Sequence, residues 1–340
     1  MPVLRAISHR ARTLSLQDEK RIMMVWAYAG LGLVILLLAG DSLVKGAVNL
    51  SLRVGIPALI VSLTIVAFGT SAPELIIGIN AVLENKAGLA LGNVVGSNTA
   101  NILLVLGVPA LVSGLHTSQC RTHKSYLQML GASVIFIALA FRGVFDVLAA
   151  VILLVVLAMM LADAFRDARN HRSAACAGPA LDEAEIEGAD PDMPWWQIIV
   201  FLVLGLIGLP LGAELLVDNA SIIARHYGVS DSVIGLTLVA LGTSLPELAT
   251  TVMAAIRRQA DVALGNVIGS NMFNLLGIIG ISALVGPIPV DPEFLRFDLW
   301  VMLAASLLLI PFVFFRQDIG RVWGVFLSLA YVSYILAVLM

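Results

Sequence analysis

Long apolar runs separated by short polar breaks cover the chain from about residue 23 onward. Ten such runs can be distinguished, near residues 23–52, 57–83, 87–113, 125–142, 144–165, 195–226, 231–256, 260–286, 295–315 and 319–339. A helix that crosses a bilayer needs about 20 apolar residues, and these runs are close to that length. Because the runs are continuously apolar and do not alternate with polar residues, the pattern predicts transmembrane helices and not a β-barrel.

The composition agrees with residence in a bilayer. Hydrophobic residues make up 59% of the 340 residues and charged residues 13%, whereas a soluble domain is about half apolar and about a quarter charged. This balance excludes a soluble enzyme, a nucleic-acid-binding protein and a disordered chain. Two distant cysteines, Cys120 and Cys176, give no disulfide framework and no cysteine metal site. We predict an all-α polytopic membrane protein with ten transmembrane helices. Its partner is the lipid bilayer, with no nucleic acid and no obligate protein partner.

Two motifs occur twice at one constant spacing. Residues Gly69–Leu75 (GTSAPEL) recur as Gly242–Leu248 (GTSLPEL), and Gly92–Asn98 (GNVVGSN) recur as Gly265–Asn271 (GNVIGSN), in both cases 173 residues later. Aligned without gaps, residues 38–107 and 211–280 are identical at 28 of 70 positions, where about one in ten is expected by chance for such a composition. The chain therefore contains an internal duplication.

The two copies lie five predicted spans apart, and an odd number means that they enter the membrane in opposite directions. Inverted repeats of this kind build many secondary transporters, whose substrate site lies near the membrane midplane where the halves meet. We expect an N-terminal tail (1–22), a first five-helix repeat (23–165), a linker (166–194) and a second, inverted five-helix repeat (195–340). The linker changes from basic to acidic and is interpreted as a solvated hinge, because its acidic part lacks the spacing of an EF-hand loop.

Basic residues in the loops predict the orientation, because cytoplasmic loops carry an excess of Lys and Arg. Loops after even-numbered spans hold four of them, Lys86, Arg142, Arg225 and Arg296. Loops after odd-numbered spans hold ten, namely Arg53, Arg121, Lys124, Arg166, Arg169, Arg172, Arg257, Arg258, Arg316 and Arg321. This places the linker in the cytoplasm and both termini outside. The basic tail opposes this orientation, and a start of translation at Met23 or Met24 would remove the conflict.

The first motif places polar groups in the middle of spans 2 and 7. Its proline lacks an N–H and so frees the carbonyl four residues earlier, while its glycine loosens the backbone. We expect a broken helix, which is tolerated at bilayer depth only where it lines a cavity or is buried in protein. Thr70 and Glu74 lie four residues apart on one helix face, as do Thr243 and Glu247. Each copy therefore offers a carboxylate, hydroxyls and loose carbonyls at one point.

The second motif adds polar side chains in spans 3 and 8. Ser97 and Asn101 lie four residues apart on one face, and Ser270 and Asn274 repeat this arrangement. Because both pairs recur at matching positions beside a carboxylate, we interpret them as cation ligands. Hydrogen bonding that only joins helices is the alternative, and close helix packing is the expected role of the motif's glycines.

All of these groups present oxygen, which hard cations prefer, and Ca²⁺ takes six to eight such ligands. None of the five histidines lies in either motif, which argues against zinc and copper. Mg²⁺ is disfavoured because it keeps its water.

If Glu74 and Glu247 are ionised and close, the empty site carries two uncompensated charges in a low-dielectric cavity, which is costly. One Ca²⁺, two Na⁺ or two protons cancel them. Only a site whose charges are neutralised by bound cations should cross the membrane barrier. The carboxylate pair therefore predicts antiport and not a uniporter or channel.

Ionisable residues also occur in spans 1 and 6. Asp41 and Lys45 lie four residues apart, and Glu214 and Asp218 hold the matching positions in the second half. We interpret Asp41 and Lys45 as a structural pair near the end of a span. A share in gating or ion access is the alternative.

The paired GTSxPE and GNVxGSNxxN motifs look like the α-repeats of the cation/Ca²⁺ antiporter superfamily, the sodium/calcium exchangers. The chain therefore resembles this superfamily. The resemblance is nearest to prokaryotic ten-helix members of bacterial inner membranes and covers nearly the whole chain from about residue 22. It implies an inverted five-plus-five fold in which spans 1 and 6 slide against the rest. It also implies exchange of Ca²⁺ for several Na⁺, with these ions as cargo and no organic cofactor.

Carried over by position, the resemblance implies ion ligands in both halves. They are Thr70, Ser71, Glu74, Ser97 and Asn101 with the backbone carbonyl of Ala67, and Thr243, Ser244, Glu247, Ser270 and Asn274 with the backbone carbonyl of Ala240. Some family members have Asp at the position of Asn274, and potassium-dependent members resemble that version. Asn at this position therefore implies no K⁺ requirement. The proton-exchanging branch usually has Asn in place of Thr-Ser after the first glycine, so GTS argues for Na⁺.

We therefore predict a secondary active transporter and not an enzyme, exchanging Ca²⁺ for Na⁺ by alternating access. Exchange of Ca²⁺ or another divalent cation for H⁺ is the alternative, since two protons neutralise the same glutamates. An intramembrane hydrolase would need a nucleophile with a base, or an HExxH motif, and neither is present in the sequence.

Overall fold

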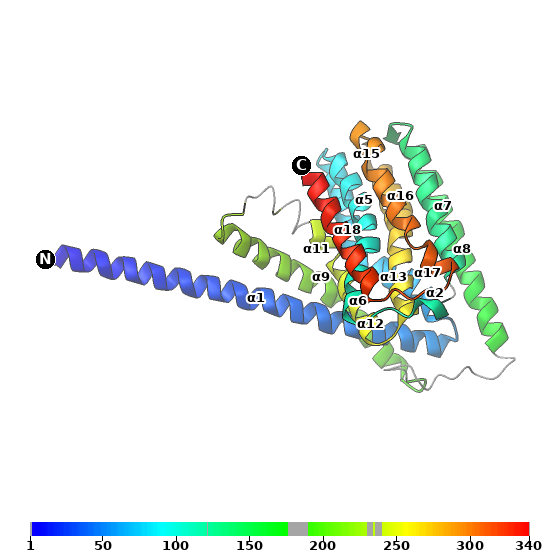
Figure 1. Ribbon diagram of the computed structural model, residues 1–340, viewed down its shortest axis with the longest axis horizontal. Helices are drawn as coiled ribbons and strands as arrows, with labels where there is room; N and C mark the ends of the chain where they lie inside the picture. Colours follow the sequence, from blue (N-terminus) through cyan, green and yellow to red (C-terminus); the bar gives the residue numbers. More distant parts are fainter. Residues whose placement is uncertain (1, 121, 176–189, 230–233, 235–239, 340) are drawn as a thin grey trace.

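A computed structural model of the chain describes residues 2–120, 122–175, 190–229, 234 and 240–339. Long helices packed side by side dominate it (Figure 1). Among the described residues, seven helices are long and apolar enough to cross a membrane, or eight if one bent pair counts as a single span. The prediction of an all-α polytopic membrane protein is confirmed, and the count of ten spans stays a prediction.

The first half of the chain consists of helices up to residue 175. They are α1 (Pro2–Val54), α2 (Ala58–Val61), the π-helix η1 (Ser62–Val66), α3 (Ala67–Thr70), α4 (Ala72–Leu83), α5 (Ala87–Leu103), α6 (Gly107–Val112), the 3₁₀-helix η2 (Thr117–Gln119), α7 (His123–Ala140) and α8 (Val147–Ala175), with strand β1 (Val144–Phe145) before α8. Helix α1 runs through both the predicted tail and the first span, so no change of backbone structure marks the expected boundary at residue 22.

The second half repeats much of this order. Its elements are α9 (Trp195–His226), α11 (Ala240–Thr243), α12 (Leu245–Ile256), α13 (Ala260–Met272), the π-helix η5 (Phe273–Ile278), α14 (Ile279–Val285), strand β2 (Ile288–Pro289), α15 (Pro292–Arg296), α16 (Asp298–Leu307), α17 (Ile310–Phe314) and α18 (Arg321–Leu339). Much of the predicted linker, including its acidic run from 182 to 187, lies outside the described residues. So do most of residues 231–239 of the predicted seventh span.

Helices α1 and α9 form a pair of their own that crosses the other helices at an angle (Figure 1). They run antiparallel, and glycines allow their backbones to approach closely. A Cβ atom on Gly205 would lie 2.5 Å from Cβ of Leu43, and one on Gly212 would lie 2.8 Å from the backbone nitrogen of Leu36. Such small residues let membrane helices pack by close backbone contact.

The helices that carry the second motif lie at the centre of the remaining bundle. In the most apolar stretch of residues 260–285, 89% of the residues are buried, and in that of residues 87–112 the share is 78%. The corresponding share is only 17% for α8 and for α18. A membrane helix without a lipid-facing side is enclosed by protein, so α5 and α13 can hold polar side chains away from hydrocarbon.

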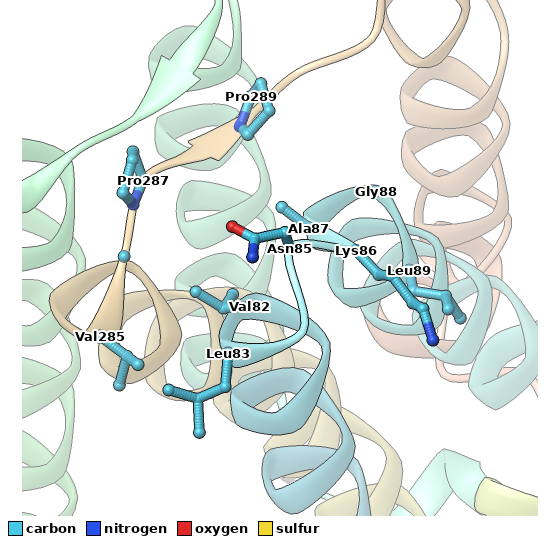
Figure 2. Close-up of a pocket in the computed structure, with 11 residues that line it drawn as sticks. Val82, Leu83, Asn85, Lys86, Ala87, Gly88, Leu89, Val285, Pro287 and Pro289 are labelled. Carbon is cyan, nitrogen blue, oxygen red and sulfur yellow. The ribbon is translucent and has the colours of Figure 1, made fainter.

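The loops contact one another in two groups at the two ends of the bundle (Figure 1). Loops after odd-numbered predicted spans meet through Leu115 and Ile319, whose backbones exchange hydrogen bonds of 3.0 Å. Loops after even-numbered spans meet where β1 and β2 pair antiparallel. Beside this pair, a cavity of about 710 Å³ separates Asn85 and Lys86 from Pro287 and Pro289 (Figure 2).

An ion pair joins α1 to the end of α12. The Arg257 guanidinium donates a short hydrogen bond to the Asp41 carboxylate, and Nζ of Lys45 lies 3.3 Å from the same group. The predicted pairing of Asp41 with Lys45 is confirmed, and Arg257 is a partner that the sequence did not suggest. The matching residue of the second half, Glu214, is exposed.

Candidate cation site

Both copies of the first motif lie at a break between two helices. Ser71 separates α3 from α4 with φ −86° and ψ 6°, and the two parts of this span are bent by 44°. Ser244 separates α11 from α12 with φ −87° and ψ 2°. In both places proline follows in the first helical turn, where its missing N–H needs no partner. The expected broken helix is confirmed.

The backbone differs between the two breaks. The carbonyl of Ala67 accepts hydrogen bonds from the Ser71 N–H at 3.1 Å and from Oγ1 of Thr70 at 3.3 Å. The Thr70 hydroxyl has a single hydrogen, which it shares between this carbonyl and Oδ1 of Asn266, so only the Ser71 N–H fully occupies a lone pair of this predicted ligand. In the second half, the Ser244 N–H bonds the carbonyl of Leu241 at 3.0 Å. Ala240 is the first residue of α11.

Glu74 and Glu247 lie in the first turns of α4 and α12, directly after the breaks. Each side chain is only 1% exposed, and the two carboxylates are close enough for their charges to repel. Both oxygens of Glu74 and Oε2 of Glu247 have no hydrogen-bond partner among the described residues. Burial of an unpaired carboxylate is costly, so this arrangement fits a cation that supplies the missing charge.

Hydroxyl groups of both halves surround the Glu247 carboxylate. Oγ of Ser71 donates to its Oε1 at 3.1 Å, across the two halves of the chain. The hydroxyls of Thr70 and Ser270 also lie beside this carboxylate. The first motif of one half and both motifs of the other therefore converge on a single point, as the repeat predicted.

Two matching contacts connect the first motif of each half to the second motif of the other. Oγ1 of Thr70 donates to Oδ1 of Asn266 at 3.3 Å, and Oγ1 of Thr243 donates to Oδ1 of Asn93 at 3.3 Å. Asn266 also donates from Nδ2 to the carbonyl of Glu247 at 3.4 Å. We did not select Asn93 and Asn266 from the sequence, although their identity in both repeats was a usable signal.

The remaining predicted ligands are also buried. Their described side chains are all at most 9% exposed, and those with a polar atom that has no partner among the described residues are Glu74, Glu247, Asn101, Ser244, Ser270 and Asn274. Ser97 is 4% exposed. The side chain of Ala240 lies outside the described residues. A concentration of buried oxygens without protein partners distinguishes this region from helix contacts that only join spans.

Close packing of α13 holds Ser270 in this region. A Cβ atom on Gly269 would lie 2.4 Å from the carbonyl oxygen of Leu63 and 2.6 Å from Cβ of Ala67. The packing role predicted for the motif's glycines is therefore confirmed in the second half. In the first half, among the described residues, a Cβ atom on Gly92 would meet only the ring of Phe294 at 3.7 Å, and one on Gly96 would meet nothing within 4 Å.

The donor set is suited to hard cations. No cluster of three or more His, Cys, Asp or Glu side chains that could hold a metal occurs within the described part of the chain, so nothing there resembles a zinc or copper centre. Two carboxylates with neutral hydroxyl and amide oxygens are the ligands that Ca²⁺ and Na⁺ prefer.

Comparisons with known proteins show the family to which this chain belongs. The profile of the family described as sodium/calcium exchanger protein matches residues 24–165 and 197–340. A putative antiporter, CaxA of Alkalimonas amylolytica, is 35% identical, and the match covers 89% of this chain and 95% of CaxA. The inner membrane protein YrbG of Escherichia coli is 33% identical, over 90% of this chain and 94% of YrbG.

A solved structure has the same fold. The sodium-calcium exchanger NCX_Mj, soaked with Na⁺ and Sr²⁺, superposes with a TM-score of 0.76 and 31% sequence identity. The superposition covers 92% of this chain and 97% of NCX_Mj. The matched family is one of membrane exchangers and not of enzymes. From the family profile over both halves, the whole-length relatives and the common fold, we conclude that the chain belongs to the sodium/calcium exchanger family.

Proposed function

We propose that this protein exchanges Ca²⁺ for Na⁺ across the membrane by alternating access, as a secondary active transporter and without a requirement for K⁺. The observation that carries the proposal is the buried pair Glu74 and Glu247, which lie directly after the breaks in both halves. Three of their four carboxylate oxygens have no hydrogen-bond partner among the described residues. One Ca²⁺ or two Na⁺ neutralise this pair, and the uncompensated pair resists passage through a low-dielectric barrier. Crystals of the related NCX_Mj were soaked with Na⁺ and with Ca²⁺ or Sr²⁺.

The proposed ligands are those named from the sequence, in both halves. The side-chain ligands are Thr70, Ser71, Glu74, Ser97, Asn101, Thr243, Ser244, Glu247, Ser270 and Asn274, and the carbonyls of Ala67 and Ala240 complete the set. The Ala67 carbonyl joins through the lone pair that the Ser71 N–H does not occupy. Asn274 is neutral, so the centre holds two carboxylates and not three.

We propose ten spans in two inverted repeats, 23–165 and 195–340, joined by the linker 166–194 and preceded by the tail 1–22. Support comes from the reciprocal contacts of Thr70 with Asn266 and of Thr243 with Asn93. An exact interchange of matching residues is what a two-fold relation between the halves produces. The antiparallel pair α1 and α9, with its own packing surface, forms the unit that slides against the other helices.

The proposed orientation places the linker in the cytoplasm and both termini outside, in a cell membrane that is the inner one in bacteria. Loops after odd-numbered spans meet at one end of the bundle and loops after even-numbered spans meet at the other. This supports spans that cross the membrane in alternating directions. The end formed by the loops after odd-numbered spans carries more of the Lys and Arg residues, as cytoplasmic ends do.

Exchange for H⁺ is the second candidate, because two protons neutralise Glu74 and Glu247 as well as two Na⁺ do.

Titration of the purified protein with Ca²⁺ in a calorimeter tests the ion selectivity of the site. We expect Na⁺ to raise the apparent Kd for Ca²⁺ by about tenfold or more, because both ions need the same carboxylates, and K⁺ at the same ionic strength to leave it unchanged. Equal effects of Na⁺ and K⁺ would refute a Na⁺-selective site.

A further inference from the structure

Two asparagines of the second motif join the halves at the centre of the molecule. Nδ2 of Asn98 donates to the backbone carbonyl of Asn271 at 3.2 Å, and Nδ2 of Asn271 donates to the backbone carbonyl of Asn98 at 3.4 Å. The two residues hold matching positions in the repeats, and each is 1% exposed. This exchange of bonds fixes α5 against α13.

The same bonds determine which way the amide of Asn271 points. A backbone carbonyl only accepts hydrogen bonds, so the carbonyl of Asn98 requires the nitrogen of the Asn271 side chain. The Asn271 oxygen then faces the other way, where it accepts a hydrogen bond from Nδ2 of Asn101 at 3.0 Å. Asn101 must therefore turn its own Oδ1 away from Asn271. That oxygen is buried and has no partner among the described residues.

We propose that Asn271 is a positioning residue for ion binding, which fixes the carboxamide of Asn101 so that its oxygen and not its nitrogen faces the cation. This inference rests on the proposed function, in which Asn101 is a ligand. A carboxamide can present either atom, and only the oxygen can bind a cation. Asn271 acts through Asn101 and needs no contact with the ion.

The matching contact in the other half is not formed. By the repeat, Asn98 should orient Asn274 as Asn271 orients Asn101. Yet Oδ1 of Asn98 and both polar atoms of the Asn274 side chain have no partner within the described part of the chain. One of the two equivalent ligand amides is therefore oriented by a neighbour and the other is not. This difference makes Asn98 a matched control for Asn271.

The test compares Asn271→Ala with Asn98→Ala in proteoliposomes, with ⁴⁵Ca²⁺ uptake driven by a Na⁺ gradient over a range of Ca²⁺ concentrations. Asn98→Ala removes one bond between α5 and α13. Asn271→Ala removes two, and the second of these is the bond that holds Asn101. We expect Asn271→Ala to raise the Ca²⁺ concentration for half-maximal uptake by about tenfold or more, as is typical when a partner of a metal ligand is lost. The maximal rate should change much less, and Asn98→Ala should leave the half-maximal concentration near the wild-type value.

A double variant separates positioning from general damage to the fold. In a protein that already carries Asn101→Ala, adding Asn271→Ala should cause no further rise, because the side chain that it orients is gone. Three results would each overturn the inference. They are equal half-maximal Ca²⁺ concentrations for Asn271→Ala and Asn98→Ala, additive effects in the double variant, and a half-maximal concentration of the Asn101→Ala protein equal to that of the wild type. Asn271→Ser, whose hydroxyl cannot reach Asn101, replaces the alanine variant if that variant does not fold. Absence of Na⁺-driven uptake in the wild-type protein would instead overturn the proposed function.

Discussion

Glu247→Gln is expected to abolish Na⁺-driven Ca²⁺ uptake. Glutamine has the shape of glutamate and can still accept the hydrogen bond from Ser71, so the main change is the loss of one of two buried charges. Removing one partner of a buried charged group costs about 3–5 kcal/mol, which corresponds to roughly 10²- to 4 × 10³-fold in affinity. Initial rates of ⁴⁵Ca²⁺ uptake into proteoliposomes measure the effect.

Glu214→Gln supplies the matched control for this variant. Glu214 lies in α9 and is exposed, so the same chemical change should leave uptake near the wild-type rate. Glu247→Gln should also fold, because it relieves the repulsion between the two carboxylates. Uptake by a well-folded Glu247→Gln protein within a few-fold of the wild-type rate would show that the buried pair does not bind the transported ion.

Gly269→Ala is expected to have the largest effect on stability. Its added Cβ would lie 2.4 Å from the carbonyl oxygen of Leu63 and 2.6 Å from Cβ of Ala67, so either α13 or the segment before the first break must move. Overpacking of this kind costs about 1–3 kcal/mol or more. We expect a clear fall in the apparent Tm of the purified protein in detergent, and loss of uptake because Ser270 and Thr70 no longer meet Glu247.

Gly131→Ala in α7 is the control, because a Cβ there meets no described atom within 4 Å. Alanine stabilises a helix by about 1 kcal/mol relative to glycine, so the Tm of this variant should be unchanged or higher. If the two variants had the same Tm, close packing of α13 against the break would not be what stabilises the site.

The sequence predicts the helical class, the helix breaks and the carboxylate pair for one physical reason. Hydrocarbon tolerates apolar helices and little else, so each polar residue inside a span is informative. The repeat then matched Glu74 with Glu247 and so led to the expectation that they meet. The repulsion between their charges and the bond from Ser71 to Glu247 agree with it. An isolated copy of the motif would not have shown which second carboxylate to consider.

Contacts that depend on how two helices are rotated and how far apart they lie could not be predicted from the sequence in this way. Arg257 reaches Asp41 over a separation of 216 residues, and nothing in local periodicity connects the two. The π-helices η1 and η5 interrupt α-helices inside apolar runs, and the hydrophobic pattern does not distinguish the two kinds of helix. The orientation of Asn101 follows from Asn271 in another helix, whose amide is itself oriented by the backbone carbonyl of Asn98, and the pattern of side chains cannot reveal this.

Uptake of ⁴⁵Ca²⁺ into Na⁺-loaded proteoliposomes, diluted into Na⁺-free buffer at equal internal and external pH, tests the central claim most directly. We predict uptake that requires the outward Na⁺ gradient, saturates with Ca²⁺ and is the same with or without K⁺. A pH gradient in the absence of Na⁺ should drive none. Uptake driven by the pH gradient alone, or uptake that needs no counter-ion, would contradict Na⁺/Ca²⁺ exchange.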